Sequence, residues 1–172
     1  MLEPGLIVSC QARPDNPLHG PAYMADMAGA AAQAGAVGLR ANGPDDVRAI
    51  KVATNLPVIG IFKIELEGYE VVITPALRCA RAVAEAEAGA DFVATTLSGY
   101  TSYSPPTVGP DLELLERLCR ALDVPVVGEG RFDDPQRVAE AFARGAHAVV
   151  VGTAITNPRE ITRRFVRGVP PR

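Results

Sequence analysis

Three segments of the chain repeat one pattern, a helix that ends at a glycine and is followed at once by a short apolar strand. They are AGAVGLRA at 34–41, AGADFVATT at 88–96 and RGAHAVVVGT at 144–153. Glycine just after a helix readily adopts the left-handed conformation that ends many helices. A second repeat, NLPVIGIFK at 55–63 and DVPVVGEGR at 123–131, places proline between a helix and the next strand. Helices that alternate with continuously apolar strands predict a parallel sheet covered on both faces.

The remaining segments supply the helices between these strands. The sequence predicts six βα units, with strands near 6–10, 37–41, 57–62, 91–96, 125–130 and 148–152, and helices over 21–34, 43–53, 74–88, 109–122, 133–144 and 157–168. Two of the helices begin with a polar cap followed by proline, at Asp134-Pro135 and Asn157-Pro158. A further short β run, VVIT at 71–74, lies within a connection.

Polar residues at the ends of the strands decide between two parallel-sheet folds. They follow nearly every strand, at Gln11, Arg40, Lys63, Thr95-Thr96, Glu129–Arg131 and Gly152-Thr153. A doubly wound sheet mainly uses the strands beside its switch point, whereas a barrel gathers every strand end around one mouth. No GxGxxG motif follows the first strand, so a dinucleotide site has little support. The sequence therefore predicts an α/β fold, a TIM-barrel-like parallel βα repeat truncated to about six units, in one domain of residues 1–172.

Composition excludes several classes of function. A net charge of −3 argues against a nucleic-acid-binding surface, which needs clustered Lys and Arg. No apolar run is long enough to span a membrane, and the N-terminus lacks a signal-peptide pattern, so we expect a cytoplasmic protein. The three cysteines lie far apart, at 10, 79 and 119, and the two histidines at 19 and 147. These numbers predict reduced thiols and no metal site.

Several strand-end phrases together resemble one family. LIVSCQA, VGLRANG, PVIGIFK, VITP, TTLSGYT, GPDLELL, PVVGEGR and VVVGTAITNPREITRRF are similar, in the same order, to segments of N-acetylmannosamine-6-phosphate 2-epimerases. The resemblance implies a (β/α)₈ barrel. It also implies interconversion of N-acetylmannosamine 6-phosphate and N-acetylglucosamine 6-phosphate in amino-sugar and sialic acid breakdown, on a phosphosugar substrate and without a cofactor.

The chain departs from this family at one internal position. Two βα units between the VITP helix and the GADFV strand have no counterpart, and one of them carries the family's active-site Asp. The segment TPALRCARAVAEAEAGADFV at 74–93 resembles the start of the family's third helix joined to the end of its fifth. Six strands would have to close a tighter ring, remain an open sheet, or borrow strands from another subunit. Open sheet edges favour association, so we expect the chain to be able to form a homo-oligomer.

The resemblance assigns catalysis to two residues at strand ends. Epimerisation removes the proton beside the aldehyde of the ring-opened sugar and returns it on the other face, which needs a base and a donor for the enolate oxygen. Lys63 is the candidate base, because desolvation and a nearby Arg40 would lower its proton affinity. Glu129 would position the substrate and assist proton transfer, and we expect it to pair with Arg131 or Lys63. Arg40 and Gln11 are candidate substrate-binding residues.

Phosphate is expected at the ends of the last two strands. Gly130-Arg131 and Gly152-Thr153 supply backbone N–H groups, close approach and a cation where barrels commonly hold phosphate. The segment LSGYTSYSPP at 97–106 is polar and rich in turn residues, and we expect it to form a loop over the mouth. Within it, Ser98 and Gly99 are candidate substrate contacts.

Each residue also admits a structural interpretation. Lys63 could be a lysine that reaches water from a strand end, and Glu129 could form a purely structural ion pair. Two other functions therefore stay open: a non-catalytic barrel remnant that binds a phosphosugar without turnover, and a different phosphate-binding barrel enzyme.

Overall fold

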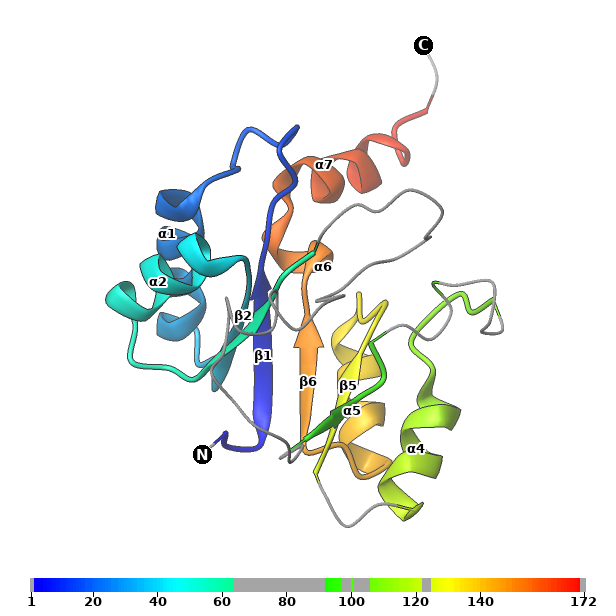
Figure 1. Ribbon diagram of the computed structural model, residues 1–172. Helices are drawn as coiled ribbons and strands as arrows, with labels where there is room; N and C mark the ends of the chain where they lie inside the picture. The colour runs from blue at the N-terminus through cyan, green and yellow to red at the C-terminus, as the bar shows by residue number, and fades with distance from the viewer. Residues whose placement is uncertain (1, 64–91, 97–99, 101–105, 122–124, 171–172) are drawn as a thin grey trace.

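The computed structural model describes residues 2–63, 92–96, 100, 106–121 and 125–170, and its core is a parallel six-stranded sheet (Figure 1). The strand order is β3-β2-β1-β6-β5-β4, and every paired neighbour is parallel. The strands are β1 (Gly5–Cys10), β2 (Gly38–Asn42), β3 (Val58–Ile61), β4 (Val93–Ala94), β5 (Val126–Glu129) and β6 (Ala148–Val151). Because the last strand pairs with the first, the order is that of a barrel and not of a doubly wound sheet.

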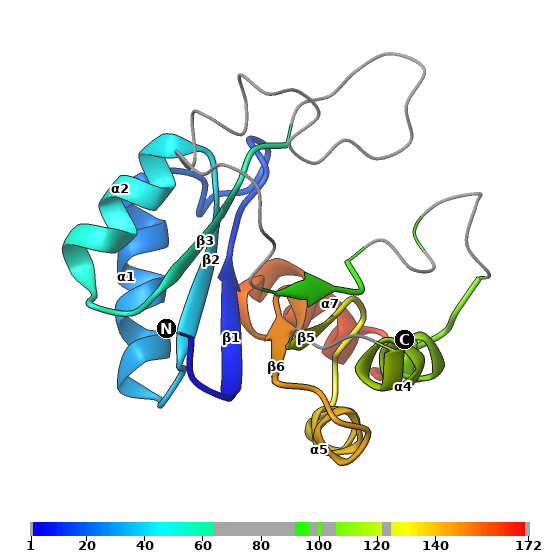
Figure 2. The same ribbon diagram turned by 60° about the horizontal axis from the view of Figure 1, so that its bottom comes forward.

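The described helices are α1 (Pro21–Gln33), α2 (Pro44–Ala53), α4 (Leu112–Ala121), α5 (Pro135–Ala143), α6 (Thr153–Thr156) and α7 (Pro158–Val166). Four of them pack on the outer face of the sheet in two groups, α1 with α2 and α4 with α5 (Figure 2), while α6 and α7 follow the carboxyl end of β6 (Figure 1). Helices α1 and α2 bury apolar residues against β1 and β2, while α4 and α5 bury theirs against β5 and β6. A third cluster, which includes Ile7, Val127 and Val150, lies on the inner face. Alternate residues of β1, β5 and β6 thus serve two cores.

The sheet is curled but open within the described residues. Strand β3 pairs there only with β2, and β4 only with β5. Six strands could close a tighter ring, remain an open sheet or borrow strands from another subunit, and the described residues form an open sheet. The two sheet ends flank the part of the chain where the sequence lacks two βα units. The prediction of a truncated, TIM-barrel-like α/β fold is confirmed.

Local signals set most of the element ends. Gly35 and Gly145 follow α1 and α5 with φ of +93° and +98°, as the helix–glycine–strand pattern predicts. Helix α4 begins three residues later than predicted, because Asp111 caps it by accepting from the Leu114 N–H at 2.9 Å. Helix α6 was not predicted, since four residues are too few to show a periodic pattern. The predicted elements at 71–74 and 74–88 lie outside the described residues.

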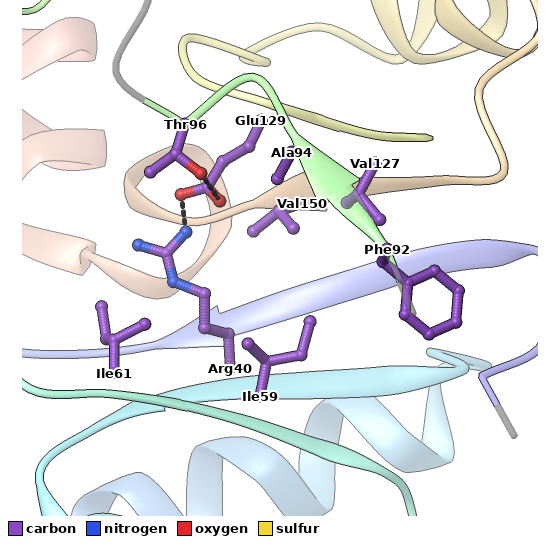
Figure 3. A pocket seen from close by; sticks show the side chains of 9 residues that line it. All are labelled: Arg40, Ile59, Ile61, Phe92, Ala94, Thr96, Val127, Glu129 and Val150. Atoms are coloured by element: carbon purple, nitrogen blue, oxygen red, sulfur yellow. Dashed lines mark hydrogen bonds and ion pairs between the residues drawn. The ribbon is translucent and has the colours of Figure 1, made fainter. Parts of the chain in front are cut away.

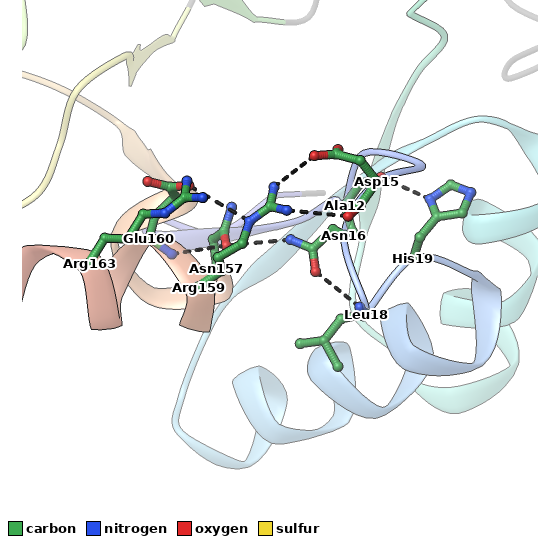
Figure 4. Close-up of polar contacts among 9 residues, drawn as sticks. All are labelled: Ala12, Asp15, Asn16, Leu18, His19, Asn157, Arg159, Glu160 and Arg163. Carbon is green, nitrogen blue, oxygen red and sulfur yellow. Dashed lines mark hydrogen bonds and ion pairs between the residues drawn. The ribbon is translucent and has the colours of Figure 1, made fainter.

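The loop after β1 is tied to the start of α7 by polar contacts (Figure 4). Arg159 donates to the backbone carbonyl of Asp15 at 3.2 Å and to its carboxylate at 3.1 Å. Asn16 donates to the Asn157 side chain at 3.4 Å and accepts from the Leu18 N–H at 3.0 Å. These bonds join the two chain regions on either side of the β1–β6 pair and fix the loop that begins at the mouth of the barrel.

The cap of α5 gives a stability prediction. Asp134 accepts a hydrogen bond from the Gln136 N–H at 2.7 Å, and Pro135 occupies the first turn. We expect Asp134→Ala to lower the free energy of unfolding by about 1 kcal/mol, because the helix loses a side-chain acceptor at its N-terminus. Asp134→Asn keeps an acceptor and should cost much less. Urea unfolding of both variants beside the wild type measures the difference, and an equal loss in both would contradict the capping role.

Candidate functional site

The carboxyl ends of the six strands converge on one side of the molecule. Because all strands are parallel, the residues that end or follow them share this mouth. Glu129 is the last residue of β5 and Arg40 lies in the middle of β2, while the other predicted site residues follow the strands. Those are Gln11 after β1, Lys63 after β3, Gly130 and Arg131 after β5, and Gly152 and Thr153 after β6.

Arg40 and Glu129 form a buried ion pair across the interior of the barrel. Their side chains are 8% and 13% exposed, and one guanidinium nitrogen meets one carboxylate oxygen (Figure 3). Burial lowers the pKa of Arg40 to about 10, which still leaves it charged at neutral pH. We expected Glu129 to pair with Arg131 or Lys63. Its partner in this ion pair is Arg40. The reason is tertiary: the curl of the sheet places inward-facing β2 opposite β5.

Two threonines that sequence reasoning did not select hold Glu129 in place. Thr96 donates to the second carboxylate oxygen of Glu129 at 2.9 Å. Thr95 accepts from the Glu129 N–H at 2.9 Å and donates to its carbonyl at 2.8 Å. Both Glu129 oxygens therefore have partners, one on β2 and one just after β4. The sequence signal was the Thr95-Thr96 pair at a strand end, but nothing in the sequence linked it to Glu129.

Lys63 is held at the mouth by residues of two other strand ends. Its ammonium donates to the Gln11 side-chain oxygen at 2.8 Å, and its backbone N–H donates to the Asn42 side chain at 2.9 Å. Although the residue as a whole is exposed, burial of its ammonium, and then the charges of Arg40 and Arg13, lower the Lys63 pKa to about 8. With such a pKa, about a tenth of the molecules carry a neutral Lys63 at pH 7, far more than for an ordinary lysine with a pKa of about 10.4.

Gln11 is oriented by two contacts. Its amide nitrogen donates to the Ser9 hydroxyl at 2.6 Å, while its oxygen accepts from Lys63. Gln11 thus connects Ser9 of β1 with the Lys63 ammonium.

The predicted phosphate-binding residues follow two adjacent strands. Strands β5 and β6 pair in register, so Gly130 and Gly152 lie at the same end of neighbouring strands. Gly130 has φ of +105° and Arg131, unusually for a non-glycine residue, has φ of +55°. This turn directs the Arg131 guanidinium over the Tyr100 ring, 4.1 Å from its centre, where it also donates to Thr107 at 2.9 Å. Thr153 is exposed at the start of α6.

A cavity of about 350 Å³ lies between the two halves of the open sheet (Figure 3). Its polar part is Arg40, Glu129 and Thr96. Its apolar wall comes from four strands and the residue before β4, namely Ile59, Ile61, Phe92, Ala94, Val127 and Val150. The candidate site therefore has a polar mouth and an apolar floor.

Other residues considered in the sequence have structural surroundings or fall outside the described part. Ser98 and Gly99 lie outside the described residues. Burial raises the pKa of the Cys10 thiol to about 11, so it is a protonated core residue. His147 contacts the Leu2 carbonyl at 3.0 Å and the Phe92 ring. Within the described ranges, His, Cys, Asp and Glu form no group of three able to hold a metal ion.

Fold and site define a parallel (β/α)-barrel protein with a lysine just after one strand and a buried arginine–glutamate pair inside the barrel. The family described as "Putative N-acetylmannosamine-6-phosphate epimerase" matches residues 24–88 and 78–170. The chain belongs to this family.

Individual relatives support the same membership. A protein named "Putative N-acetylmannosamine-6-phosphate 2-epimerase" from Caldanaerobacter subterraneus subsp. tengcongensis is 43% identical, with 96% of this chain and 91% of the relative covered. One of the same name from Clostridioides difficile is 38% identical, covering 95% of each. The structure of the N-acetylmannosamine-6-phosphate 2-epimerase from Clostridium perfringens superposes with a TM-score of 0.89 at 34% identity, covering 98% of this chain and 94% of that one.

The comparisons also locate the missing segment. The family matches the chain in two pieces that overlap at residues 78–88. The alignment to the Caldanaerobacter relative spans 215 positions, 43 more than the 172 residues of this chain. The sequence prediction of an internal deletion within the segment 74–93 agrees with both findings.

Proposed function

We propose that this protein is an isomerase that interconverts N-acetylmannosamine 6-phosphate and N-acetylglucosamine 6-phosphate. The observation that carries the proposal is the arrangement of Lys63, Arg40 and Glu129 at one barrel mouth in a chain of the epimerase family. These are the groups that proton transfer beside a carbonyl requires: a base with a lowered pKa, a cation for the developing oxyanion and a positioned carboxylate.

In the proposed reaction, neutral Lys63 removes the proton from C2 of the ring-opened sugar. The electrons of the C2–H bond form a C1–C2 double bond, and the C1 oxygen becomes an enolate. Arg40 stabilises this oxygen through guanidinium N–H groups that remain beyond its contact with Glu129. The enolate then turns its opposite face toward Lys63, whose ammonium returns the proton to C2 as the C1 carbonyl re-forms, and Glu129 positions the substrate and assists this transfer. Gln11 holds the Lys63 ammonium between the two steps.

The phosphate of the substrate would bind after β5 and β6. Gly130 and Gly152 allow close backbone approach at neighbouring strand ends, and Arg131 and Thr153 follow them. Arg131 would contribute positive charge from its place above Tyr100. We also propose that Ser98 and Gly99 contact the substrate.

The cellular location and the oligomeric state of the protein are part of the same proposal. A phosphorylated sugar is an intracellular metabolite, so we propose a cytoplasmic location. Within the described part of the chain, no helix has the length and apolarity to cross a bilayer. Among the described residues, β3 and β4 each pair on one side only, and such sheet edges favour a homo-oligomer.

The test of the function is the entry of solvent deuterium at C2 of N-acetylmannosamine 6-phosphate, followed by NMR. We expect exchange together with formation of N-acetylglucosamine 6-phosphate. Binding of the phosphosugar without any exchange would overturn the enzymatic proposal. It would instead favour a barrel remnant that binds the ligand, and the deletion that removes the family's active-site Asp makes this the alternative to test.

The lowered pKa of Lys63 predicts the pH dependence of the reaction. The base must be neutral in the free enzyme, so kcat/KM should rise about tenfold per pH unit below pH 8 and level off above it. Rates measured from pH 6.5 to 9.5 avoid most of the titration of the substrate phosphate, whose second pKa is about 6. A profile that keeps rising to pH 10 would mean that Lys63 has an ordinary pKa or is not the base.

A further inference from the structure

The open sheet leaves a cavity directly beneath the residues that would act on C2. Six apolar side chains line its wall, and the Arg40–Glu129 pair with Thr96 forms its polar side. In a complete barrel the interior is filled by layers of side chains from all strands. Here the described strands leave about 350 Å³, and Ile59 on the edge strand β3 remains 37% exposed.

The proposed substrate has one apolar part, and it is attached at the reacting carbon. The acyl group is joined through nitrogen to C2, whereas C3, C4 and C5 carry hydroxyl groups or the ring oxygen and C6 carries the phosphate. The residues proposed to act at C2 are Lys63, Arg40 and Glu129, and two of these three also line the cavity. An acyl group on C2 is therefore the substituent best placed to enter it.

Arg40 supplies a polar contact for such a group. Its Nε is buried and has no hydrogen-bond partner among the described residues, while another of its nitrogens pairs with Glu129. A buried donor without an acceptor is unfavourable, so a shift of the Arg40 side chain that turns Nε toward the cavity would let a ligand oxygen there satisfy it. The carbonyl oxygen of an N-acyl group is an acceptor of this kind, next to an apolar tail.

From these observations we infer that the site accepts amino-sugar phosphates with N-acyl chains longer than acetyl. The inference rests on the proposed function for the identity of the sugar. The methyl group of an acetyl, about the size of one water molecule at roughly 30 Å³, fills only a small part of the cavity. Each methylene moved from water onto the apolar wall is worth about fourfold in affinity, converted from ~0.8 kcal/mol.

The experiment measures binding and turnover separately along an acyl series. Calorimetry gives Kd for the N-acetyl, N-propanoyl, N-butanoyl and N-hexanoyl forms of glucosamine 6-phosphate, and deuterium exchange gives kcat/KM for the same series. We expect Kd to fall about fourfold per methylene as far as the butanoyl form. Tighter binding along the series supports the inference whether or not exchange occurs.

A cavity-filling variant locates the effect. Ala94→Leu adds volume to the cavity wall on β4, so the ratio of hexanoyl to acetyl affinity should fall about tenfold or more. Ala22→Leu adds the same volume on the exposed side of α1 and should leave the ratio unchanged. Kd that is constant or rises with chain length, or equal ratios in the two variants, would overturn the inference. Loss of exchange with every substrate would count against the proposed function alone.

Discussion

In Lys63→Ala, solvent deuterium should enter C2 of N-acetylmannosamine 6-phosphate about 10² to 10⁴ times more slowly than in the wild type. The magnitude is that of a general base in proton transfer. Removal of the ammonium also removes its contact with Gln11, but leaves the residues proposed to hold the phosphate unchanged. We therefore expect kcat to carry most of the loss, with the affinity for the phosphosugar within a few-fold of normal, measured by calorimetry.

The sequence provides a matched control, because Lys51 is the only other lysine. It lies exposed in the last turn of α2, outside the mouth. Lys51→Ala removes the same chemical group and should leave exchange within twofold of the wild type. Equal exchange in Lys63→Ala and the wild type, at equal protein stability, would remove Lys63 from the mechanism and with it the reason for the pH profile.

Much of this site follows from local sequence. Lys63 and Gly152 come directly after apolar runs, and parallel strands bring such ends together whatever lies between them. The helix ends at Gly35 and Gly145 and the caps at Asp134 and Asn157 are short-range signals that involve only a few neighbouring residues. Predictions of this kind depend on spacing alone, and the structure confirms them for each of these residues.

Pairings across the barrel could not be derived in the same way. Glu129 pairs with Arg40, which is 89 positions earlier in the chain, because the curl of the sheet brings β2 and β5 face to face. The sequence shows that a buried carboxylate needs a partner but not how far the sheet curls, so it suggested Arg131 or Lys63 and not Arg40. The left-handed conformation of Arg131, which directs its side chain to Tyr100, was also invisible in the sequence.

The internal deletion places the two ends of the described sheet beside the candidate site. Strands β3 and β4 become the ends of the sheet, and they are also two of the strands that line the cavity. The polar pair between β2 and β5 spans this opening from one half of the sheet to the other. In a barrel that lacks two strands, the pair therefore adds a link across the opening to the contacts that join the halves at β1, β6 and the start of α7 among the described residues.

Loss of this pair should have the largest effect on stability of the substitutions considered. Arg40→Ala leaves the Glu129 carboxylate, only 13% exposed, without its counter-charge and, among the described residues, with Thr96 as its remaining side-chain donor. Breaking a buried pair by removing one partner costs about 3–5 kcal/mol, because the remaining charge stays away from water. We expect Arg40→Ala to lower the free energy of unfolding by this amount, measured by urea unfolding at pH 7.

Two further variants separate an unpaired charge from a loss of packing. The double variant Arg40→Met, Glu129→Leu replaces both charges by apolar side chains and should recover most of the stability, since a well-packed apolar pair often matches a buried ion pair. Arg48→Ala removes an arginine from an exposed pair with Asp45, in which both side chains are 72% exposed, and should cost at most about 1 kcal/mol. If Arg40→Ala were no worse than Arg48→Ala, the two halves of the sheet would not depend on the buried pair, and Arg40 would be free to serve the substrate alone.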